Sequence, residues 1–208
     1  MSPVKPVVYV VYYSMYGHIQ RMAHEVMKGL QSTGKVDAHL FQVKETLSDE
    51  VLGLMKAPAK ASDVPVLHPK DMVNADAFLF GIPTRYGNQP AQVRAFWDQT
   101  GGLWAQGALR NKMAGMFFST GSQHGGQETT AFTFLTTMAH HGMIYVPIGF
   151  GHKALSDNTE VVGGSAYGSG TVANGDGSRL PTEKELSIAE FQGSSFADVV
   201  AQFHNGKK

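Results

Sequence analysis

Residues 7–30 read VVYVVYYSMYGHIQRMAHEVMKGL, and this stretch decides the fold class. Its first part, Val7–Tyr13, is β-branched and aromatic without alternation, which is typical of a strand buried on both faces. After a short break, apolar residues recur at helical spacing from Ile19 to Leu30, which predicts an amphipathic helix ending near Gly29 and Gly34. A buried strand that leads through a tight turn into such a helix is the repeating unit of an α/β fold.

The same alternation continues along the chain, so we expect a single domain over residues 1–208. Further strands are predicted at 36–43, 77–81, 113–119 and 144–148, and helices at 91–99, at 129–141 and after a capping box formed by Thr182 and Glu185. Five such strands suit a flavodoxin-like parallel sheet of order 2-1-3-4-5 with helices on both faces. Residues 44–75 are expected to be irregular, and the Gly-rich residues 149–180 to form an ordered insertion or loop near subunit contacts.

Composition excludes several classes of function. The chain has 17 Lys and Arg against 17 Asp and Glu, and this neutral balance argues against nucleic-acid binding, which needs surplus positive charge. The absence of cysteine excludes disulfides and Cys-ligated metal sites, and we predict no metal site. No apolar run is long enough to span a membrane, so we expect a cytoplasmic protein. Only 16% of the residues are charged, against about 25% in an average protein, which favours an oligomer.

Three unusual loops are expected at the carboxyl ends of the strands, where ligands bind in open parallel sheets. The first, Ser14–Ile19, enters a helix N-terminus, whose free N–H groups suit a phosphate. Residues 83–90 include Tyr86, which could lie against a flat ring, and residues 119–128 offer many backbone donors. Each loop alone is also ordinary turn chemistry, such as an N-capping serine or a mobile polar loop. Three of them on one edge favour a binding site.

Together the motifs in these loops and beyond them resemble the WrbA family, the flavodoxin-like NAD(P)H:quinone oxidoreductases of type IV. The resemblance extends from Tyr9 to Gly193. The motifs that support it are YYSMYGHI at 12–19, PTRYGN at 83–88, DQTGGLW at 98–104, STG at 119–121, GGQE at 125–128, AHHGM at 139–143 and GDGSR at 175–179.

The resemblance implies noncovalently bound flavin mononucleotide (FMN) and assigns roles to individual residues. The FMN phosphate would be held by Ser14, Met15, Tyr16, Gly17, His18 and Ile19. The flavin ring would be bound by Pro83, Thr84, Arg85, Tyr86, Gly87, Asn88, Ser119, Thr120, Gly121, Ser122, Gln123, Gly125 and Gly126, with His140 at its edge. Tyr16, Trp104 and Phe150 would contact the substrates. Family members are tetramers, so a homotetramer built as a dimer of dimers is expected.

The predicted activity is two-electron reduction of a quinone to a hydroquinone, with NADH or NADPH as the electron donor and ping-pong hydride transfer. No residue is expected to act covalently, because the cofactor performs the chemistry, with Arg85 and His140 supporting it. Two alternatives stay open: a one-electron carrier of the flavodoxin type, and a regulatory module in which FMN only supports the structure. The neutral net charge disfavours the carrier, because electron carriers use charge fields to find their redox partners.

Overall fold

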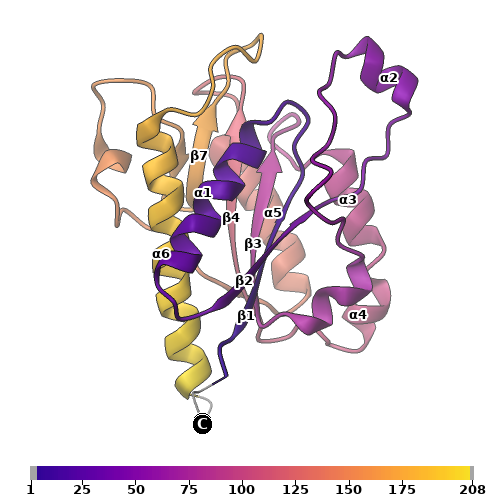
Figure 1. Cartoon of the computed structure of the whole chain (residues 1–208), viewed down its shortest axis with the longest axis vertical. Helices are drawn as coiled ribbons and strands as arrows, with labels where there is room; N and C mark the ends of the chain where they lie inside the picture. The colour runs from indigo at the N-terminus through magenta and orange to yellow at the C-terminus, as the bar shows by residue number, and fades with distance from the viewer. Residues whose placement is uncertain (1–3, 207–208) are drawn as a thin grey trace.

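A computed structural model describes residues 4–206, and in it a central sheet lies between two layers of helices (Figure 1). The strand order is β2-β1-β3-β4-β7-β6, and β5 pairs with β4 beside this path. The strands are β1 (Val7–Tyr12), β2 (Asp37–Gln42), β3 (Ala77–Pro83), β4 (Met113–Thr120), β5 (Ile144–Tyr145), β6 (Gly164–Ser165) and β7 (Gly168–Val172). The helices are α1 (His18–Ser32), α2 (Asp49–Leu54), α3 (Ala91–Asp98), α4 (Gly101–Ala105), α5 (Gln127–His140) and α6 (Glu183–Gly206).

The flavodoxin-like order 2-1-3-4-5 is confirmed, but two strands share the fifth position. β5 pairs in parallel with the beginning of β4, at Met113 and Ala114, and β7 pairs in parallel with its end, at residues 118–120. The predicted fifth strand, 144–148, is therefore too long, because β5 ends at Tyr145 and the chain pairs with β4 again only in β7, which begins at Gly168. The sheet also gains the short antiparallel strand β6, which pairs with β7.

The Gly-rich residues 149–180 are consequently not one loop. They contain the 3-10 helix η2 (Lys153–Ser156), β6 and the fully buried strand β7. The sequence of β7, GSGTV, has too little apolar character to predict a strand. Its glycines are required because a Cβ on Gly168 would overlap the carbonyl oxygen of Met116 on β4.

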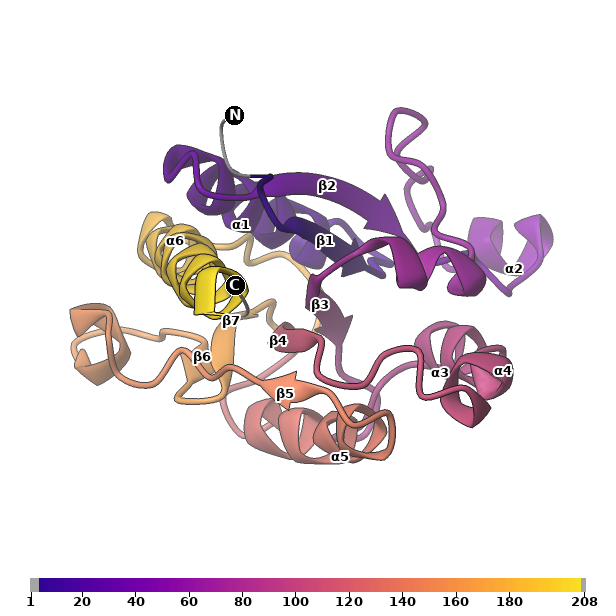
Figure 2. The same cartoon turned by 90° about the horizontal axis from the view of Figure 1, so that it is seen from below.

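Helices cover both faces of the sheet, as predicted. Helices α1 and α6 pack on one face, with Ile19, Met22 and Phe196 among the buried side chains. Helices α3 and α5 pack on the other face through an aromatic cluster that includes Phe80, Trp97 and Phe134 (Figure 2). The strands between these layers are apolar on both faces for this reason, and β3 and β4 are buried along their whole length.

The first helix ends close to Gly34, as predicted, but Gly29 does not mark its end. It continues to Ser32, with Gly29 inside it, and a Cβ at this position would overlap the carbonyl oxygen of Glu190 on α6. Gly193 faces α1 in the same way, since its Cβ would overlap the carbonyl oxygen of Val26. The two glycines permit the close crossing of α1 and α6, so Gly29 marks a contact between helices and not a helix end.

Two short helices lie in segments for which no helix was predicted. Helix α2 begins after Ser48, whose hydroxyl caps the Val51 N–H, and it has no buried residue. Without a buried face it leaves no apolar periodicity in the sequence. A 3-10 helix, η1 (Pro69–Asn74), follows in the same region. Helix α4 has two glycines in five residues, and because glycine has a low helix propensity, the sequence did not predict a helix there.

The predicted capping box at the start of α6 is confirmed. The Thr182 hydroxyl accepts the Glu185 N–H at 3.2 Å, and the Glu185 carboxylate accepts the Thr182 N–H at 2.9 Å. Over residues 4–206, none of the helices is long and apolar enough to cross a membrane. The same residues include no cluster of three or more His, Asp or Glu side chains suited to a metal ion.

Candidate functional site

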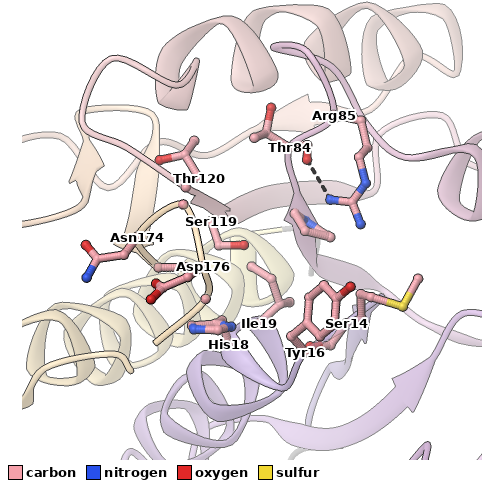
Figure 3. A pocket seen from close by; sticks show the side chains of 16 residues that line it. Ser14, Tyr16, His18, Ile19, Thr84, Arg85, Ser119, Thr120, Asn174 and Asp176 are labelled. Carbon is pink, nitrogen blue, oxygen red and sulfur yellow. Dashed lines mark hydrogen bonds between the residues drawn. The ribbon is translucent and has the colours of Figure 1, made fainter. Parts of the chain in front are cut away.

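A cleft of about 510 Å³ lies at the carboxyl ends of the parallel strands (Figure 3). Four connections form its walls: β1–α1, β3–α3, β4–α5 and β7–α6. The lining residues are Ser14, Met15, Tyr16, His18, Ile19, Pro83, Thr84, Arg85, Ser119, Thr120, Gly121, Ala173, Asn174, Gly175, Asp176 and Gly177. The three loops predicted from the sequence thus meet at one edge, together with a fourth that was not predicted to bind.

The β1–α1 loop presents the amino terminus of α1 to this cleft. The Ser14 hydroxyl accepts the Gly17 N–H at 3.0 Å, and Gly17 adopts a φ of 89°, in the region that favours glycine. No side chain caps the first turn of α1, and this turn contains no acidic residue. The positive end of the helix dipole therefore stays available to an anion.

The β3–α3 loop is a tight turn that places Thr84 and Arg85 at the cleft. The backbones of Arg85 and Asn88 exchange hydrogen bonds of 2.7 and 3.0 Å, and the Thr84 hydroxyl accepts the Gly87 N–H at 3.1 Å. The Arg85 guanidinium donates to the Thr84 carbonyl at 2.8 Å and keeps further donors for a ligand. Tyr86, at a φ of 55°, is fully exposed and outside the set of lining residues.

The β4–α5 loop divides between two surfaces. Ser119, Thr120 and Gly121 line the cleft as predicted. Gln123 and Gly126, in contrast, line a separate depression toward β6, and Ser122 and Gly125 close the turn between them through a backbone hydrogen bond of 3.1 Å. This second group is therefore not among the residues that line the cleft of one chain.

The fourth wall, residues 173–177, was missed as a binding element. The only sequence signal was the GDGSR motif at 175–179, for which the resemblance supplied no role. The Asp176 carboxylate accepts the N–H and hydroxyl of Ser178, and these bonds lower its pKa. His18, the first residue of α1, donates from its ring Nε2 to the Arg179 carbonyl at 3.0 Å. This hydrogen bond joins the fourth wall to α1.

A buried ion pair holds the fourth wall in place. The Arg179 guanidinium lies 2.9 Å from Glu185, whose side chain is 0% exposed. Glu185 also accepts the N–H groups of Gly163 and Thr182 and the hydroxyl of Thr171, each at 2.9 Å. A buried charge is tolerated when it is paired and hydrogen-bonded in this way.

Three further residues assigned to the site also lie outside the cleft of the single chain. Trp104 is on α4 with 58% of its surface exposed, and Phe150 is exposed between β5 and η2. His140 ends α5, beside the beginning of β4, whereas the cleft lies at the end of β4. Six residues of strand separate these points by about 20 Å at roughly 3.3 Å per residue. One chain therefore does not bring Trp104 or His140 to its own cleft.

The cleft suits the phosphate of the FMN that the resemblance implies. An uncapped helix terminus with no acidic residue in its first turn, the Ser14 hydroxyl and the close approach allowed at Gly17 are the features that bind phosphate at such termini. The volume lies within the range of about 300–1,000 Å³ that is usual for cofactor and ligand sites. The Thr84 and Arg85 side chains add polar donors on the opposite wall.

Comparison with known proteins places this geometry in a family. Residues 10–142 match the flavodoxin family model. The quinone oxidoreductase QR2 of Triphysaria versicolor is 56% identical over 193 residues, covering 92% of this chain and 94% of that protein. The NAD(P)H quinone oxidoreductase PST2 of Candida albicans is 53% identical over 199 residues, covering 96% and 98%.

Solved structures show the same fold. A WrbA-like flavodoxin from Agrobacterium tumefaciens superposes with a TM-score of 0.66 at 22% identity, over 95% of this chain and 99% of that one. With these matches, the four loops around the cleft and the strand order that brings them together identify the chain as a member of the flavodoxin family and, within it, of the NAD(P)H quinone oxidoreductases.

Proposed function

We propose that this protein is an FMN-dependent NAD(P)H:quinone oxidoreductase that reduces quinones to hydroquinones by two-electron transfer. The observation that supports this most strongly is identity above 50%, over nearly the whole chain, to proteins named as NAD(P)H quinone oxidoreductases. The cleft provides the matching chemistry, because it combines an uncapped helix terminus with Thr84 and Arg85 on the facing wall.

The chain's own residues bind and orient the reactants. The amino terminus of α1 and the Ser14 hydroxyl receive the phosphate of the cofactor. Bound FMN supplies the hydride-transfer chemistry, for which the protein offers no covalent nucleophile. Arg85 places a permanent positive charge beside the cleft, which favours added negative charge there. NAD(P)H and the quinone use the same open face in turn, so the kinetics should be ping-pong.

We further propose a homotetramer, built as a dimer of dimers, in which a neighbouring subunit supplies Trp104 and His140 to each cleft. The exposure of Trp104 and Phe150 and the distance of His140 from its own cleft support this arrangement. The cysteine-free composition favours a cytoplasmic location.

The test is NAD(P)H oxidation by the purified protein with benzoquinone, with and without added FMN. We expect FMN-dependent oxidation of NADH or NADPH, and parallel lines in double-reciprocal plots at several quinone concentrations. Comparing the two nucleotides identifies the electron donor. A protein that binds FMN but oxidises neither nucleotide with any benzoquinone would instead be an electron carrier or a regulatory module.

A further inference from the structure

Lys60 lies directly beneath the β1–α1 loop, outside every motif that suggested a site. Its ammonium group donates to the Ser14 carbonyl oxygen at 2.8 Å and pairs with the Glu45 carboxylate at 2.9 Å. It also lies 4.5 Å from the centre of the Tyr13 ring, in cation–π geometry. One lysine from the long β2–β3 connection thus contacts two consecutive residues of the loop that receives the phosphate.

Glu45 keeps this lysine in position. Its carboxylate accepts the Tyr13 hydroxyl at 2.8 Å, the Gln92 amide at 2.7 Å and the Leu47 N–H at 3.1 Å, in addition to Lys60. Burial opposes ionisation of Glu45, but the hydrogen bonds from Lys60, the Leu47 N–H, Tyr13 and Gln92 outweigh it and lower its pKa to about 2. Glu45 is therefore charged at neutral pH and holds Lys60 against the loop.

The segment that presents Lys60 is fixed to the sheet and to the cleft. We call residues 55–64 the strap. The Gln42 amide at the end of β2 donates to the carbonyls of Ala61 and Val64, at 2.7 and 2.6 Å. At the other end of the strap, the Tyr16 hydroxyl lies 3.4 Å from the Met55 carbonyl. Lys60 therefore acts from a fixed support and is more than a mobile surface side chain.

The orientation of one peptide group links Lys60 to ligand binding. In a planar trans peptide the C=O and the following N–H point in opposite directions. Since Lys60 holds the Ser14 carbonyl toward the strap, the Met15 N–H must point away from the strap, and Met15 lines the cleft. Lys60 thereby fixes a backbone donor of the loop before any ligand arrives, which lowers the entropic cost of binding.

We propose that Lys60, held by Glu45, is a positioning residue that preorganises the β1–α1 loop for the FMN phosphate. The inference rests on the proposed function, because it assigns Lys60 to the phosphate end of that cofactor's site. Lys60 acts through the Ser14–Met15 peptide and does not itself line the cleft. Removing it should weaken the binding of flavins that have a phosphate and spare those that do not.

The test compares FMN with riboflavin, which lacks the phosphate, by titrating the flavin-free full-length protein and following flavin fluorescence. For Lys60→Met we expect the FMN dissociation constant to rise about tenfold or more, since hydrogen bonds to charged groups are of that strength. The riboflavin dissociation constant should change less than about twofold. Lys60→Arg should bind FMN nearly as the wild type does. Lys44→Met, at an exposed neighbour of Glu45, is the matched control and should change neither constant.

The outcomes separate a role of Lys60 at the phosphate from a general structural role and from no role. An equal rise of the dissociation constants for FMN and riboflavin, or no rise for FMN, overturns the proposed role of Lys60. Because Lys60→Met leaves Glu45 without its cation, the double variant Lys60→Met/Glu45→Gln removes both charges, and its melting temperature without flavin shows whether the fold persists. It should show the same selective loss of FMN. If the wild type binds neither flavin, the proposed function itself fails, whereas wild-type FMN binding that is unaffected in both variants refutes only this inference.

Discussion

Two carboxylates, one buried and one partly buried, fix the backbone where the sheet meets the cleft. Glu185 accepts hydrogen bonds from four segments, namely β7, the residue before β6, the start of α6 and Arg179 in the β7–α6 connection. Glu45 does the same for the β1–α1 loop, the strap and α3. Neither carboxylate is among the lining residues, yet each orders a wall of the cleft. Carboxylates with several hydrogen-bond partners thus set the backbone positions on which the binding of a ligand depends.

His141 is the residue whose titration should make stability depend on pH. The Thr100 hydroxyl donates to the Trp97 carbonyl at 2.6 Å, so it accepts from His141 Nε2 at 3.0 Å. Nδ1 is buried without a hydrogen-bond partner among the described residues. Protonation would place an unpaired charged donor there, and burial together with the neighbouring His140 lowers the pKa of His141.

The sign of the effect follows from this lowered pKa. Below the ordinary histidine pKa of about 6.5 the unfolded chain takes up a proton that the folded chain refuses. The stability that neutral His141 contributes is therefore present above that pH and is lost as the pH falls below it, by at most about 1.4 kcal/mol per pH unit for one proton. We expect His141→Asn to flatten this loss between pH 7.5 and 5.5, measured by urea unfolding at fixed protein concentration. His24→Asn, at an exposed position, should leave the slope as in the wild type, and an unchanged slope in His141→Asn would contradict the prediction.

Among the elements, the crossing of α1 and α6 has the least tolerance for change. Gly193 packs against the backbone of α1 near Val26, and Gly29 packs against α6 near Glu190. The same helix α1 begins at the cleft with His18 and Ile19, so its position on the sheet also sets the position of the phosphate loop. Packing at this crossing is therefore coupled to the geometry of the site.

Substituting Gly193 by alanine should destabilise the protein by about 3 kcal/mol, because the added methyl group overlaps a carbonyl oxygen of the facing helix. Chemical denaturation measures this loss. The control is Gly53→Ala inside α2, where a Cβ meets nothing within 4 Å, and which should gain about 0.5–1 kcal/mol of helix propensity. Equal stabilities for Gly193→Ala and the wild type would show that the helices separate without cost.

At the scale of the whole molecule, the sequence predicted what depends on local pattern. The buried strand Val7–Tyr12, the stripe of α1 and the capping box of α6 have strong periodic or capping signals, and all three are present. Strand β7 was missed because its composition is set by a contact distant in sequence. Gly168 is needed where the backbone lies close to β4, and glycine gives no strand signal. Lys60 and Glu45 were missed for the same reason, since only the fold brings them under Ser14. The loops at the cleft could be predicted because the ends of parallel strands share one edge.

In the proposed tetramer, each cleft is completed by residues of a neighbouring subunit. Trp104 and His140 lie near the opposite end of the sheet from the cleft of their own chain, so each cleft would use these two residues from a neighbour. Two inactive variants should then restore each other. Ser14→Glu places a negative charge where the phosphate binds and should abolish FMN binding, whereas Trp104→Ala should keep FMN and lose quinone reduction.

When the two variants are dissociated, mixed and reassembled, some clefts of the Trp104→Ala chains face an intact Trp104 from a Ser14→Glu chain. Quinone-dependent NAD(P)H oxidation should then reappear in the mixed oligomers. Mixing Trp104→Ala with a Ser14→Glu/Trp104→Ala double variant supplies no intact Trp104 and should stay inactive. If the first mixture also stays inactive while native mass spectrometry shows mixed oligomers, each cleft uses only its own chain. In that case α4 would have to move by about the length of a strand to reach the cleft, which its attachment to His141 through Thr100 opposes.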